Sequence, residues 1–489
     1  MIIRASFDKL IVPVMELPDL HTIQLNPNQH LQTQIHQHIV EWICSGRLPA
    51  TTKLPSSRQL AQDLGVSRNT ICLVFDQLKS EGFIETYQGK GVYIATELPI
   101  QDLSTKHLQS KEIQTLPMLS KFAQSLQKDV FTDTSQPLPF TLGIPDLSTF
   151  PIKIWQQIQR LHQNRTSLMG YDGYQGFKPL RQAIATYLRL SRGVHCDAEQ
   201  IIITQGAQQA ISLCAQILLD EGDTVFLENP GYLGAKQALQ SKNIHPVPLI
   251  NQCVDVDYLF ELKGKLLYTT PTHQYPLGGV LSAGQRLKLI DWAASQHTWI
   301  IEDDYDSEFY FNHKPIAALH SMTQANTVIY LGSFSKTLFP ALRVGYLVVP
   351  KQLIEVFTQT KSFMTGESPL LNQAIISDFI TEGHFTRHLR KMRKLYKQKW
   401  LHFDQLISEK LSEVATPIAE SAGMHLVIEI PNIDDKKLRQ YLFKNGFGGS
   451  ELSRYYIGDA EKTGLVLGFA NTTEEQRVQC IALIQAYLT

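Results

Sequence analysis

The sequence predicts a large α/β domain with a mixed, mostly parallel sheet, preceded by a small and mainly helical domain. After residue 137, short apolar runs alternate with longer stretches of helical periodicity, which is typical of parallel sheets. Residues 97–137 between the two parts contain six Gln and five Ser but no Gly, which indicates a polar linker. The predicted domains are residues 22–96 and 138–489.

The overall composition excludes several classes of protein. The 489 residues carry 45 Lys and Arg against 46 Asp and Glu, and 43% are hydrophobic, so a disordered chain is excluded. No apolar run approaches about 18 residues, which argues against a membrane-spanning helix. Because the net charge is −1, any nucleic-acid-binding surface must be local. Six widely spaced cysteines favour buried free thiols and a cytoplasmic location.

Two short helices joined by a tight turn are predicted in the first domain. Ser56 can cap the first helix, Gln59 completes a capping-box pattern, and Gly65 ends this helix. The second helix opens at Ser67 and has an apolar stripe at i, i+3, i+4 and i+7. The stripe consists of Ile71, Val74, Phe75 and Leu78. This arrangement has the form of a helix-turn-helix motif.

A β-hairpin is predicted after the second helix. Two short apolar runs, Ile84–Thr86 and Val92–Ile94, flank a turn that contains Gly89 and Gly91. Glycines at a hairpin tip supply the positive φ angles that tight turns need.

The first turn of the second helix carries the predicted DNA contacts. Arg68, Asn69 and Thr70 face away from the apolar stripe, in the position from which a helix-turn-helix protein reaches base edges. Arginine can bind guanine and asparagine can bind adenine in a bidentate manner. Arg58 and Lys90 would contact the DNA backbone or the minor groove. A helical docking domain with solvated basic residues is the alternative.

This region resembles the winged helix-turn-helix of GntR-type bacterial transcription regulators over about residues 32–95. The motifs that carry the resemblance are Gly46-Arg47-Leu48-Pro49, Leu54-Pro55-Ser56-Ser57-Arg58, Gly65-Val66-Ser67-Arg68-Asn69-Thr70 and Gly89-Lys90-Gly91. Thr51 departs from the pattern, because many relatives have glycine there. The resemblance implies that operator DNA is contacted by Arg58, Ser67, Arg68, Asn69, Thr70 and Lys90.

In the second domain, the motif Ser333-Phe334-Ser335-Lys336 directly follows a predicted strand, Val328–Leu331. A lysine that forms a Schiff base needs a lowered pKa and a fixed position beside a carbonyl carbon. The two serines could donate to a phosphate, and Arg343 could bind the same phosphate. The alternative is an ordinary surface turn of serine and lysine.

A second signal is the acidic end of the predicted strand Trp299–Glu302. In open α/β folds, ligands bind at the carboxyl edge of the sheet. A pyridoxal ring needs a carboxylate beside its ring nitrogen, and Asp303 is the candidate, with Tyr305 donating to the phenolic oxygen. An acidic strand end could instead bind Mg²⁺ or remain hydrated.

Two further loops follow predicted strands. Gln205-Gly206-Ala207-Gln208 opens a helix whose first N–H groups could bind a phosphate. Asn229-Pro230-Gly231-Tyr232 offers an aromatic face on which a cofactor ring can stack. Each could be an ordinary strand-to-helix loop, but four such loops at carboxyl ends of strands favour one shared site.

Together these motifs resemble the fold type I aminotransferases, from about Pro139 to the C-terminus. The resemblance implies the cofactor pyridoxal 5′-phosphate (PLP), bound covalently to Lys336. It also implies that Tyr171 reaches the phosphate of a neighbouring subunit, that Arg454 binds a substrate carboxylate, and that Tyr275 replaces a family asparagine. The other implied cofactor-binding residues are Asp303, Tyr305, Tyr232, Gly206, Ala207, Gln208, Ser333, Ser335 and Arg343.

The order of winged helix, linker and aminotransferase-like domain resembles the MocR/GabR family of regulators over nearly the whole chain. This resemblance implies a homodimeric, PLP-dependent transcription regulator, with a domain-swapped dimer as one option. An amino acid or amine would be sensed by forming an external aldimine. A catalytically active aminotransferase with an accessory DNA-binding domain is the alternative, and a sensor of PLP itself is a third hypothesis.

His384 and His388 have the i, i+4 spacing that can align two metal ligands on a helix. No Glu follows in the His-Glu-x-x-His order, and the neighbouring residues are basic. We therefore predict no metal site and a solvated basic helix face.

Overall fold

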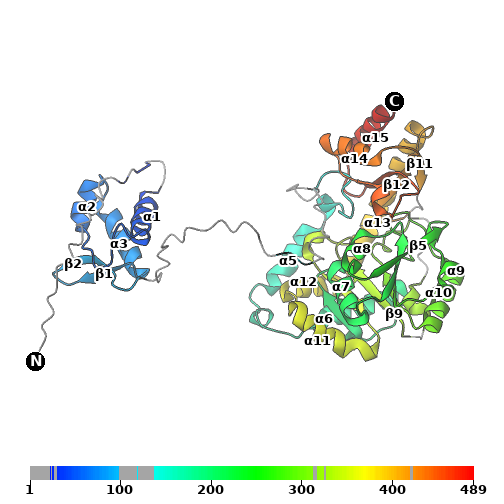
Figure 1. Cartoon of the computed structure of the whole chain (residues 1–489), viewed down its shortest axis with the longest axis horizontal. Helices are drawn as coiled ribbons and strands as arrows, with labels where there is room; N and C mark the ends of the chain where they lie inside the picture. Colours follow the sequence, from blue (N-terminus) through cyan, green and yellow to red (C-terminus); the bar gives the residue numbers. More distant parts are fainter. Residues whose placement is uncertain are drawn as a thin grey trace, which may run out of the picture. The chain divides into compact units, whose positions relative to one another are not determined.

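The computed structural model describes residues 23, 25–26, 30–98, 118, 120, 137–311, 317–323, 326–418 and 422–489. The chain divides into two compact units, Met1–Ser120 and Lys121–Thr489 (Figure 1). Within the polar linker the sequence also predicts a short helix around residues 119–126, and of this stretch only Ser120 is among the described residues.

The described residues of the smaller unit form three helices followed by a two-stranded antiparallel hairpin. One side of each helix packs into a common core, in which Ile39, Leu60 and Ile71 are fully buried. Its elements are α1 (Leu31–Cys44), α2 (Ser57–Asp63), α3 (Arg68–Ser80), β1 (Ile84–Tyr87) and β2 (Gly91–Ile94). The structure therefore has the predicted helices and hairpin.

The helix caps agree only partly with the sequence-based prediction. The Ser56 side chain accepts a hydrogen bond from the Gln59 backbone N–H at 3.2 Å, as expected for an N-cap. The Gln59 side chain donates to Asp63 instead of reaching back to Ser56. The predicted reciprocal capping box is therefore only half formed, because the i, i+4 partner on the same helix takes the Gln59 amide.

Thr51 adopts a left-handed backbone conformation with φ = 66°, which costs a non-glycine residue about 1–2 kcal/mol. We expect Thr51→Gly to stabilise the smaller unit by about 1 kcal/mol, because the relieved strain exceeds the added freedom of the unfolded chain. Amide hydrogen exchange in α3 measures this change. The matched variant Thr52→Gly, at a residue without positive φ, should destabilise the unit. If the two variants changed stability equally, backbone strain at Thr51 would not be the cause.

The larger unit is built on an eight-stranded sheet among its described residues, with the order β3-β10-β9-β8-β7-β4-β5-β6. Its strands are β3 (Ile201–Thr204), β4 (Thr224–Asn229), β5 (Asn243–Ile250), β6 (Cys253–Val254), β7 (Leu266–Thr269), β8 (Trp299–Asp303), β9 (Val328–Ser333) and β10 (Gly345–Val348). β10 is antiparallel to both neighbours and β6 is antiparallel to β5, while the other pairs are parallel. The carboxyl ends of β3, β4, β7, β8 and β9 consequently share one edge.

Helices cover both faces of this sheet, as the near-continuous apolar strands require. In β3, Ile202 packs into one core while Ile201 and Ile203 pack into another, because strand side chains alternate. The helices are α5 (Ile152–His162), α6 (Lys178–Arg192), α7 (Ala207–Leu218), α8 (Leu233–Leu239), α9 (Val256–Leu259), α10 (Ala283–Gln296), α11 (Ile354–Thr365) and α12 (Leu370–Thr381).

A C-terminal layer follows the long helix α13 (His384–Lys410). A four-stranded antiparallel sheet lies there with two helices, at the end of the unit that carries the C-terminus (Figure 1). Its elements are β11 (Thr416–Ile418), β12 (His425–Glu429), α14 (Asp435–Lys444), β13 (Ser450–Glu451), β14 (Gly464–Gly468) and α15 (Glu474–Leu488). This sheet was not predicted.

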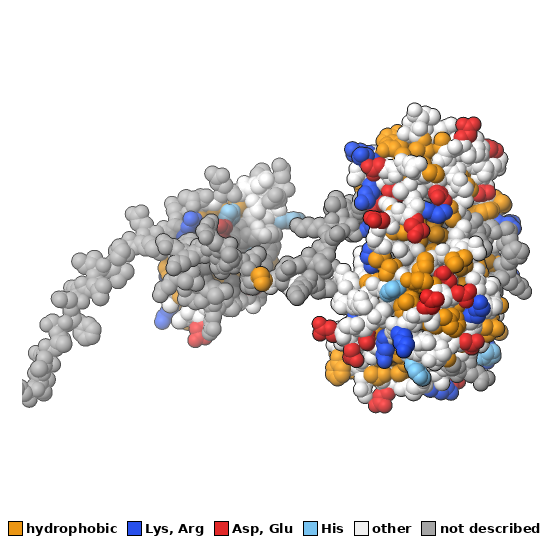
Figure 2. Space-filling view, turned by 45° about the vertical axis from the view of Figure 1, so that its right-hand side comes forward, with side chains coloured by type: hydrophobic (Ala, Val, Ile, Leu, Met, Phe, Trp, Pro, Cys, Tyr) orange, Lys and Arg blue, Asp and Glu red, His pale blue; other side chains and the backbone are white. Residues whose placement is uncertain are grey.

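Charges of both signs are interspersed over the visible face of the larger unit (Figure 2), which agrees with the net charge of −1. None of the described helices is long and apolar enough to cross a membrane. None of the six cysteines forms a disulfide, but Cys44 is exposed and only three are buried, so the expectation of buried thiols holds only in part.

The prediction of a solvated face at His384 and His388 is wrong for His388. Its side chain is buried, and Nε2 lies 3.1 Å from the carbonyl oxygen of Thr337, to which it donates. Burial lowers the pKa of His388 to about 4, so the neutral ring acts as a packing and hydrogen-bonding group. His384 contacts Glu382 and Arg387. The described residues contain no cluster of three metal-ligating side chains.

Candidate functional site

The loops that follow the strands at one sheet edge enclose a cavity of about 360 Å³. Its lining includes one lysine, two aspartates and an arginine, together with aromatic residues. The predicted site residues found in this lining are Lys336, Asp303, Tyr305, Tyr232, Ala207, Gln208, Ser333, Ser335 and Arg343. The structure therefore brings most of the predicted site together from four separate stretches of chain.

Asp303, the last residue of β8, is 3% exposed and points one carboxylate oxygen at the Tyr268 hydroxyl. Tyr268 donates to Oδ2 at 2.5 Å, whereas Oδ1 is buried and has no hydrogen-bond partner. Burial raises the pKa of Asp303 to about 7, against the opposing effect of the Tyr268 hydrogen bond. A buried acceptor without a partner is unfavourable, so Oδ1 is suited to accept an N–H from a bound group.

The other carboxylates at the end of β8 have structural partners. Glu302 accepts from the backbone N–H groups of Leu319 and His320 and lies 3.7 Å from Arg286. Asp304 forms a buried ion pair with Arg192 at 2.6 Å. Because these carboxylates are already satisfied, the acidic strand end is neither a hydrated edge nor a Mg²⁺ cluster. Asp303 alone points an unpartnered oxygen inward.

Lys336 lies directly after β9, where its Nζ donates to the carbonyl oxygen of Gly143 at 3.3 Å. A Cβ atom at Gly143 would lie 1.8 Å from Nζ, and the φ angle of Gly143 is +72°, so a side chain there would displace the lysine. Burial lowers the pKa of Lys336, although the nearby Asp306 and Asp303 oppose this effect. A lowered pKa makes the free amine available as a nucleophile.

One end of the cavity is suited to a phosphate group. The hydroxyls of Ser333 and Ser335 lie 3.1 Å apart. Gly206 is the N-cap of α7, whose first two residues line the same cavity, and helix N-termini favour phosphate. A Cβ atom on Gly206 would lie 3.3 Å from an Arg343 nitrogen, so the two loops are in close contact. The Gln208 side chain donates to the Gly234 carbonyl at 3.0 Å, which ties α7 to α8.

Aromatic rings form one side of the cavity. Tyr232 stacks on Tyr268 with ring centroids 6.2 Å apart and an interplanar angle of 24°. Tyr275, which stands where an asparagine was expected from the resemblance, contacts Tyr232 and Tyr305 edge to face. Its hydroxyl lies 3.3 Å from that of Tyr455.

The residues of the cavity fit PLP. The unpartnered oxygen of Asp303 is available for the ring nitrogen, Lys336 for the aldehyde, and the serine and arginine end for the phosphate. This fit rests on the donor and acceptor types that converge here.

Apart from Gly206, which caps α7 beside Arg343, two predicted cofactor- or effector-binding residues are absent from the described cavity lining. Tyr171 is 93% exposed. Arg454 lies in a 3-10 helix, Leu452–Tyr455, and is absent from the described cavity lining. Neither can therefore be assigned to a cofactor or effector from the geometry of one chain.

Sequence reasoning missed several residues in or beside this cavity, among them Tyr268, His273, Asp306 and Gly143. Tyr268 and Asp303 lie 35 residues apart, and their contact follows from the parallel pairing of β7 with β8. Asp306 was visible in the acidic run, but its proximity to His273 at 3.0 Å requires the fold. No local signal identified Gly143.

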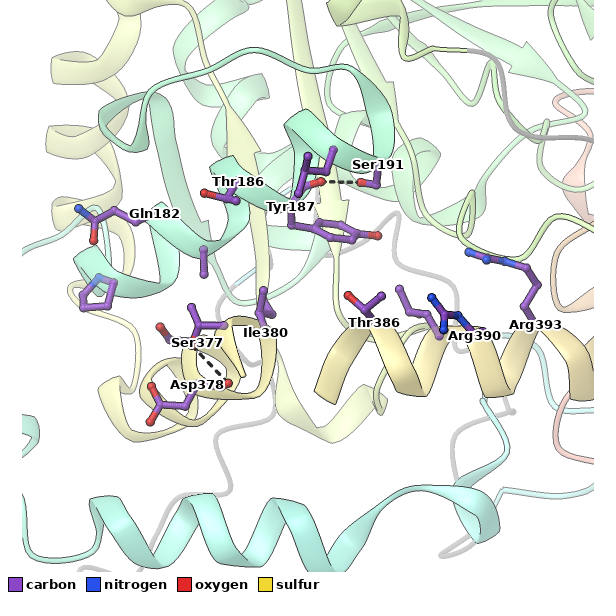
Figure 3. A pocket seen from close by; sticks show the side chains of 15 residues that line it. Gln182, Thr186, Tyr187, Ser191, Ser377, Asp378, Ile380, Thr386, Arg390 and Arg393 are labelled. Atoms are coloured by element: carbon purple, nitrogen blue, oxygen red, sulfur yellow. Dashed lines mark hydrogen bonds between the residues drawn. The ribbon is translucent and has the colours of Figure 1, made fainter. Parts of the chain in front are cut away.

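A larger hollow, of about 760 Å³, lies between α6, α12 and α13 (Figure 3). It is lined by residues such as Tyr187, Thr386 and Arg390, and none of the predicted site residues is among them. It lacks the combination of lysine, unpartnered carboxylate and phosphate-binding loop that characterises the smaller cavity.

In the smaller unit, the predicted DNA contacts lie on exposed parts of α2, α3 and the hairpin. Arg68 and Asn69 are exposed in the first turn of α3. Ser67 is the N-cap, because its hydroxyl oxygen accepts the Thr70 N–H at 3.1 Å, so Ser67 and Thr70 also have a structural role. Arg58 and Lys90 are exposed.

The buried Asp303 carboxyl makes cofactor-free stability depend on pH. Its folded-state pKa of about 7 exceeds the unfolded value of about 3.9, so the folded state binds more protons and loses stability as pH rises toward 7. Relative to Asp303→Asn, the cofactor-free native protein should lose about 2–3 kcal/mol between pH 5 and pH 8. Denaturant unfolding at both pH values measures this, and a pH-independent difference would contradict it.

Comparison with known proteins agrees with both units. Residues 139–454 match the family model "Aminotransferase class I and II", and residues 31–94 match "Bacterial regulatory proteins, gntR family". The crystal structure of Pyrococcus horikoshii kynurenine aminotransferase superposes with a TM-score of 0.69 at 26% identity, over 76% of this chain and 98% of that one.

Two similar proteins span nearly the whole chain. The probable rhizopine catabolism regulatory protein MocR of Rhizobium meliloti is 36% identical over 448 residues, 90% of either chain. The pyridoxine biosynthesis transcriptional regulator PdxR of Corynebacterium glutamicum is 28% identical over 466 residues, 93% of this chain and 95% of its own. The predicted fold class, regulatory function and PLP cofactor are confirmed by these matches. This chain therefore belongs to the MocR/GabR family of transcription regulators, which join a GntR-type winged helix-turn-helix to an aminotransferase-like domain.

Proposed function

We propose that this protein controls transcription by coupling operator binding to the state of a PLP molecule held covalently by Lys336. The observation that carries the proposal is one cavity in which Lys336 faces Asp303, whose buried Oδ1 lacks a partner. A regulator of this kind acts in the cytoplasm, where its operator DNA is found. The effector is an amino acid or another amine.

Each residue has a distinct task in this proposal. When bound, PLP supplies an aldehyde that amines attack and a protonated ring that withdraws electrons. Lys336 would hold the aldehyde carbon, and Asp303 would accept the ring N–H through Oδ1. Ser333, Ser335 and Arg343 bind the phosphate together with the first N–H groups of α7. Tyr232 stacks on the ring, and Tyr305 donates to the phenolic oxygen.

A homodimer completes the site. Tyr171 is 93% exposed and outside its own cavity, so we assign it to the phosphate of the partner subunit. Two winged helices in one dimer would read two half-sites of the operator. The polar linker permits a domain-swapped arrangement. Arg454 is assigned to an effector carboxylate.

Two other functions have specific support. The 2-aminoadipate transaminase of Thermus thermophilus is 30% identical over 305 residues, 60% of this chain and 75% of its own, which favours a test for full transamination. The similarity to PdxR favours a test of PLP itself as effector. Steady production of keto acid with an amino donor and acceptor would identify a working transaminase.

The decisive experiment records the absorption spectrum of the purified protein, then maps the modified peptide after borohydride reduction. We expect a cofactor band that shifts with one amine of a panel, and a modification at Lys336. Lys336→Ala should abolish trapping and the effector response of operator binding. Lys351→Ala, at a lysine whose side chain is 71% exposed, serves as the control. The proposal would be rejected if operator affinity changed neither on addition of amines or PLP nor in the Lys336→Ala variant.

A further inference from the structure

Three side chains meet beside the wall of the cofactor cavity. His273 Nδ1 lies 2.9 Å from the Tyr305 hydroxyl oxygen and 3.0 and 3.1 Å from the two carboxylate oxygens of Asp306. His273 belongs to the loop after β7, whereas Tyr305 and Asp306 follow β8. Tyr305 and Asp306 line the cavity, and His273 is absent from its described lining.

We propose that His273 and Asp306 are positioning residues, which keep the Tyr305 hydroxyl as a donor toward the phenolic oxygen of the bound cofactor. This inference rests on the proposed function, because it assumes that PLP occupies the cavity beside Tyr305. It adds a histidine outside the described cavity lining and a carboxylate within it, and assigns both to act through the tyrosine.

The hydrogen-bonding capacity of the three groups fixes the direction of donation. An ionised carboxylate can only accept, and both oxygens of Asp306 lie near Nδ1, so we assign the hydrogen to Nδ1 of His273. A protonated Nδ1 cannot accept the Tyr305 proton. The Tyr305 oxygen therefore faces an N–H donor, and its own proton is left for an acceptor inside the cavity.

The surrounding packing holds this arrangement. His273 is 5% exposed and Asp306 is 2% exposed, and the His273 and Tyr305 rings stack at 5.9 Å with an angle of 26°. Gly423 leaves the necessary space, because a Cβ atom there would lie 2.3 Å from His273 Cε1 and 2.6 Å from an Asp306 oxygen. A buried and packed histidine has few alternative orientations.

The other titratable groups nearby are compatible with this role. His425 of β12 lies 5.4 Å from His273 between ring centroids, and its Nε2 donates to the Pro276 carbonyl at 2.8 Å. Burial lowers the pKa of His425 to about 4, so it adds no positive charge. Burial and the charge of Asp306 raise the pKa of Tyr305, which keeps its hydroxyl protonated. Lys336, Asp303 and Tyr275 face the same cavity.

A donor at the phenolic oxygen stabilises the deprotonated form of the lysine-bound cofactor. Its removal should raise the pH midpoint of the cofactor absorbance change by about one unit, the size expected when a hydrogen bond to a charged group is lost. Tyr305→Phe removes the donor directly. His273→Ala should also raise this midpoint. Without the Nδ1–H donor, the Tyr305 hydroxyl can donate to Asp306 in place of the phenolic oxygen.

The test is a double-mutant cycle read by absorbance titration of holoprotein: native protein, His273→Ala, Tyr305→Phe and the double variant. We expect His273→Ala to shift the midpoint in the native background and to add nothing in the Tyr305→Phe background. His273→Asn, which can place an amide N–H near the position of Nδ1, should restore at least half of the shift.

The outcomes separate this inference from the proposed function. If the native protein shows no cofactor band that can be trapped on Lys336, the proposed function fails. If the native protein shows the cofactor absorbance change with pH, and His273→Ala and His273→Asn both have the same midpoint as the native protein, only the positioning role is overturned. An equal shift in both Tyr305 backgrounds also overturns it, because His273 would then act independently of the tyrosine.

Discussion

Replacement of Arg68 by alanine is expected to lower operator affinity by about 30-fold to 20,000-fold. A bidentate contact to a base contributes about 1–3 kcal/mol, and a dimer would lose two such contacts. Arg68 is exposed in the first turn of α3, so the substitution removes no core packing. Fluorescence anisotropy with an operator fragment at fixed salt concentration measures the change.

A matched control for this experiment lies on the same helix. Lys79 is exposed near the C-terminal end of α3, away from the turn predicted to enter the major groove. Lys79→Ala should change operator affinity by less than about threefold. The cofactor absorbance should be identical in both variants. Equal affinities of Arg68→Ala and Lys79→Ala for the operator would refute the DNA-reading role of α3.

Asp303→Ala is expected to weaken cofactor retention by about 30-fold to several thousand-fold. Truncating one partner of a buried charge pair costs about 2–5 kcal/mol, and Asp303 is 3% exposed with Oδ1 directed at no other group. Equilibrium dialysis and the spectrum of the reconstituted protein measure the loss.

Two related variants separate the charge of Asp303 from its shape. Asp303→Asn keeps the volume and one acceptor but removes the charge, so its affinity should lie close to that of Asp303→Ala. Tyr268→Phe removes only the hydrogen bond to Oδ2 and should weaken binding about tenfold. If Asp303→Asn bound the cofactor with the affinity of the native protein, the carboxylate charge would not be what holds the ring nitrogen.

The sequence predicted site residues correctly placed in the cavity where each lies at the end of one strand or in the loop that follows it. The strands that end near Thr204, Asn229, Asp303 and Ser333 were all predicted, because apolar runs end in small or polar residues there. Parallel strands then bring their carboxyl ends to one edge without further information. This explains why most of the residues predicted for the site meet in one cavity.

The remainder depends on contacts between distant segments. Tyr268 meets Asp303 through strand pairing, and His273 meets Asp306 through two loops. His388 is surrounded by basic residues in sequence, yet it points into the core toward Thr337. A single chain likewise leaves Tyr171 and Arg454 as predictions, because neither lies in its own cavity.

The contact between Lys336 and Gly143 ties the reactive amine to the start of the larger unit. The segment that supplies Gly143 also provides Leu142 and Ile144 to the cavity lining, and it begins a few residues after the linker that ends at residue 137. Lys336 is therefore hydrogen-bonded to a segment that lies a few residues after the predicted linker in the sequence. A group that binds the Lys336 amine would compete with this hydrogen bond, so we expect its first effect outside the cavity at the backbone of Gly143.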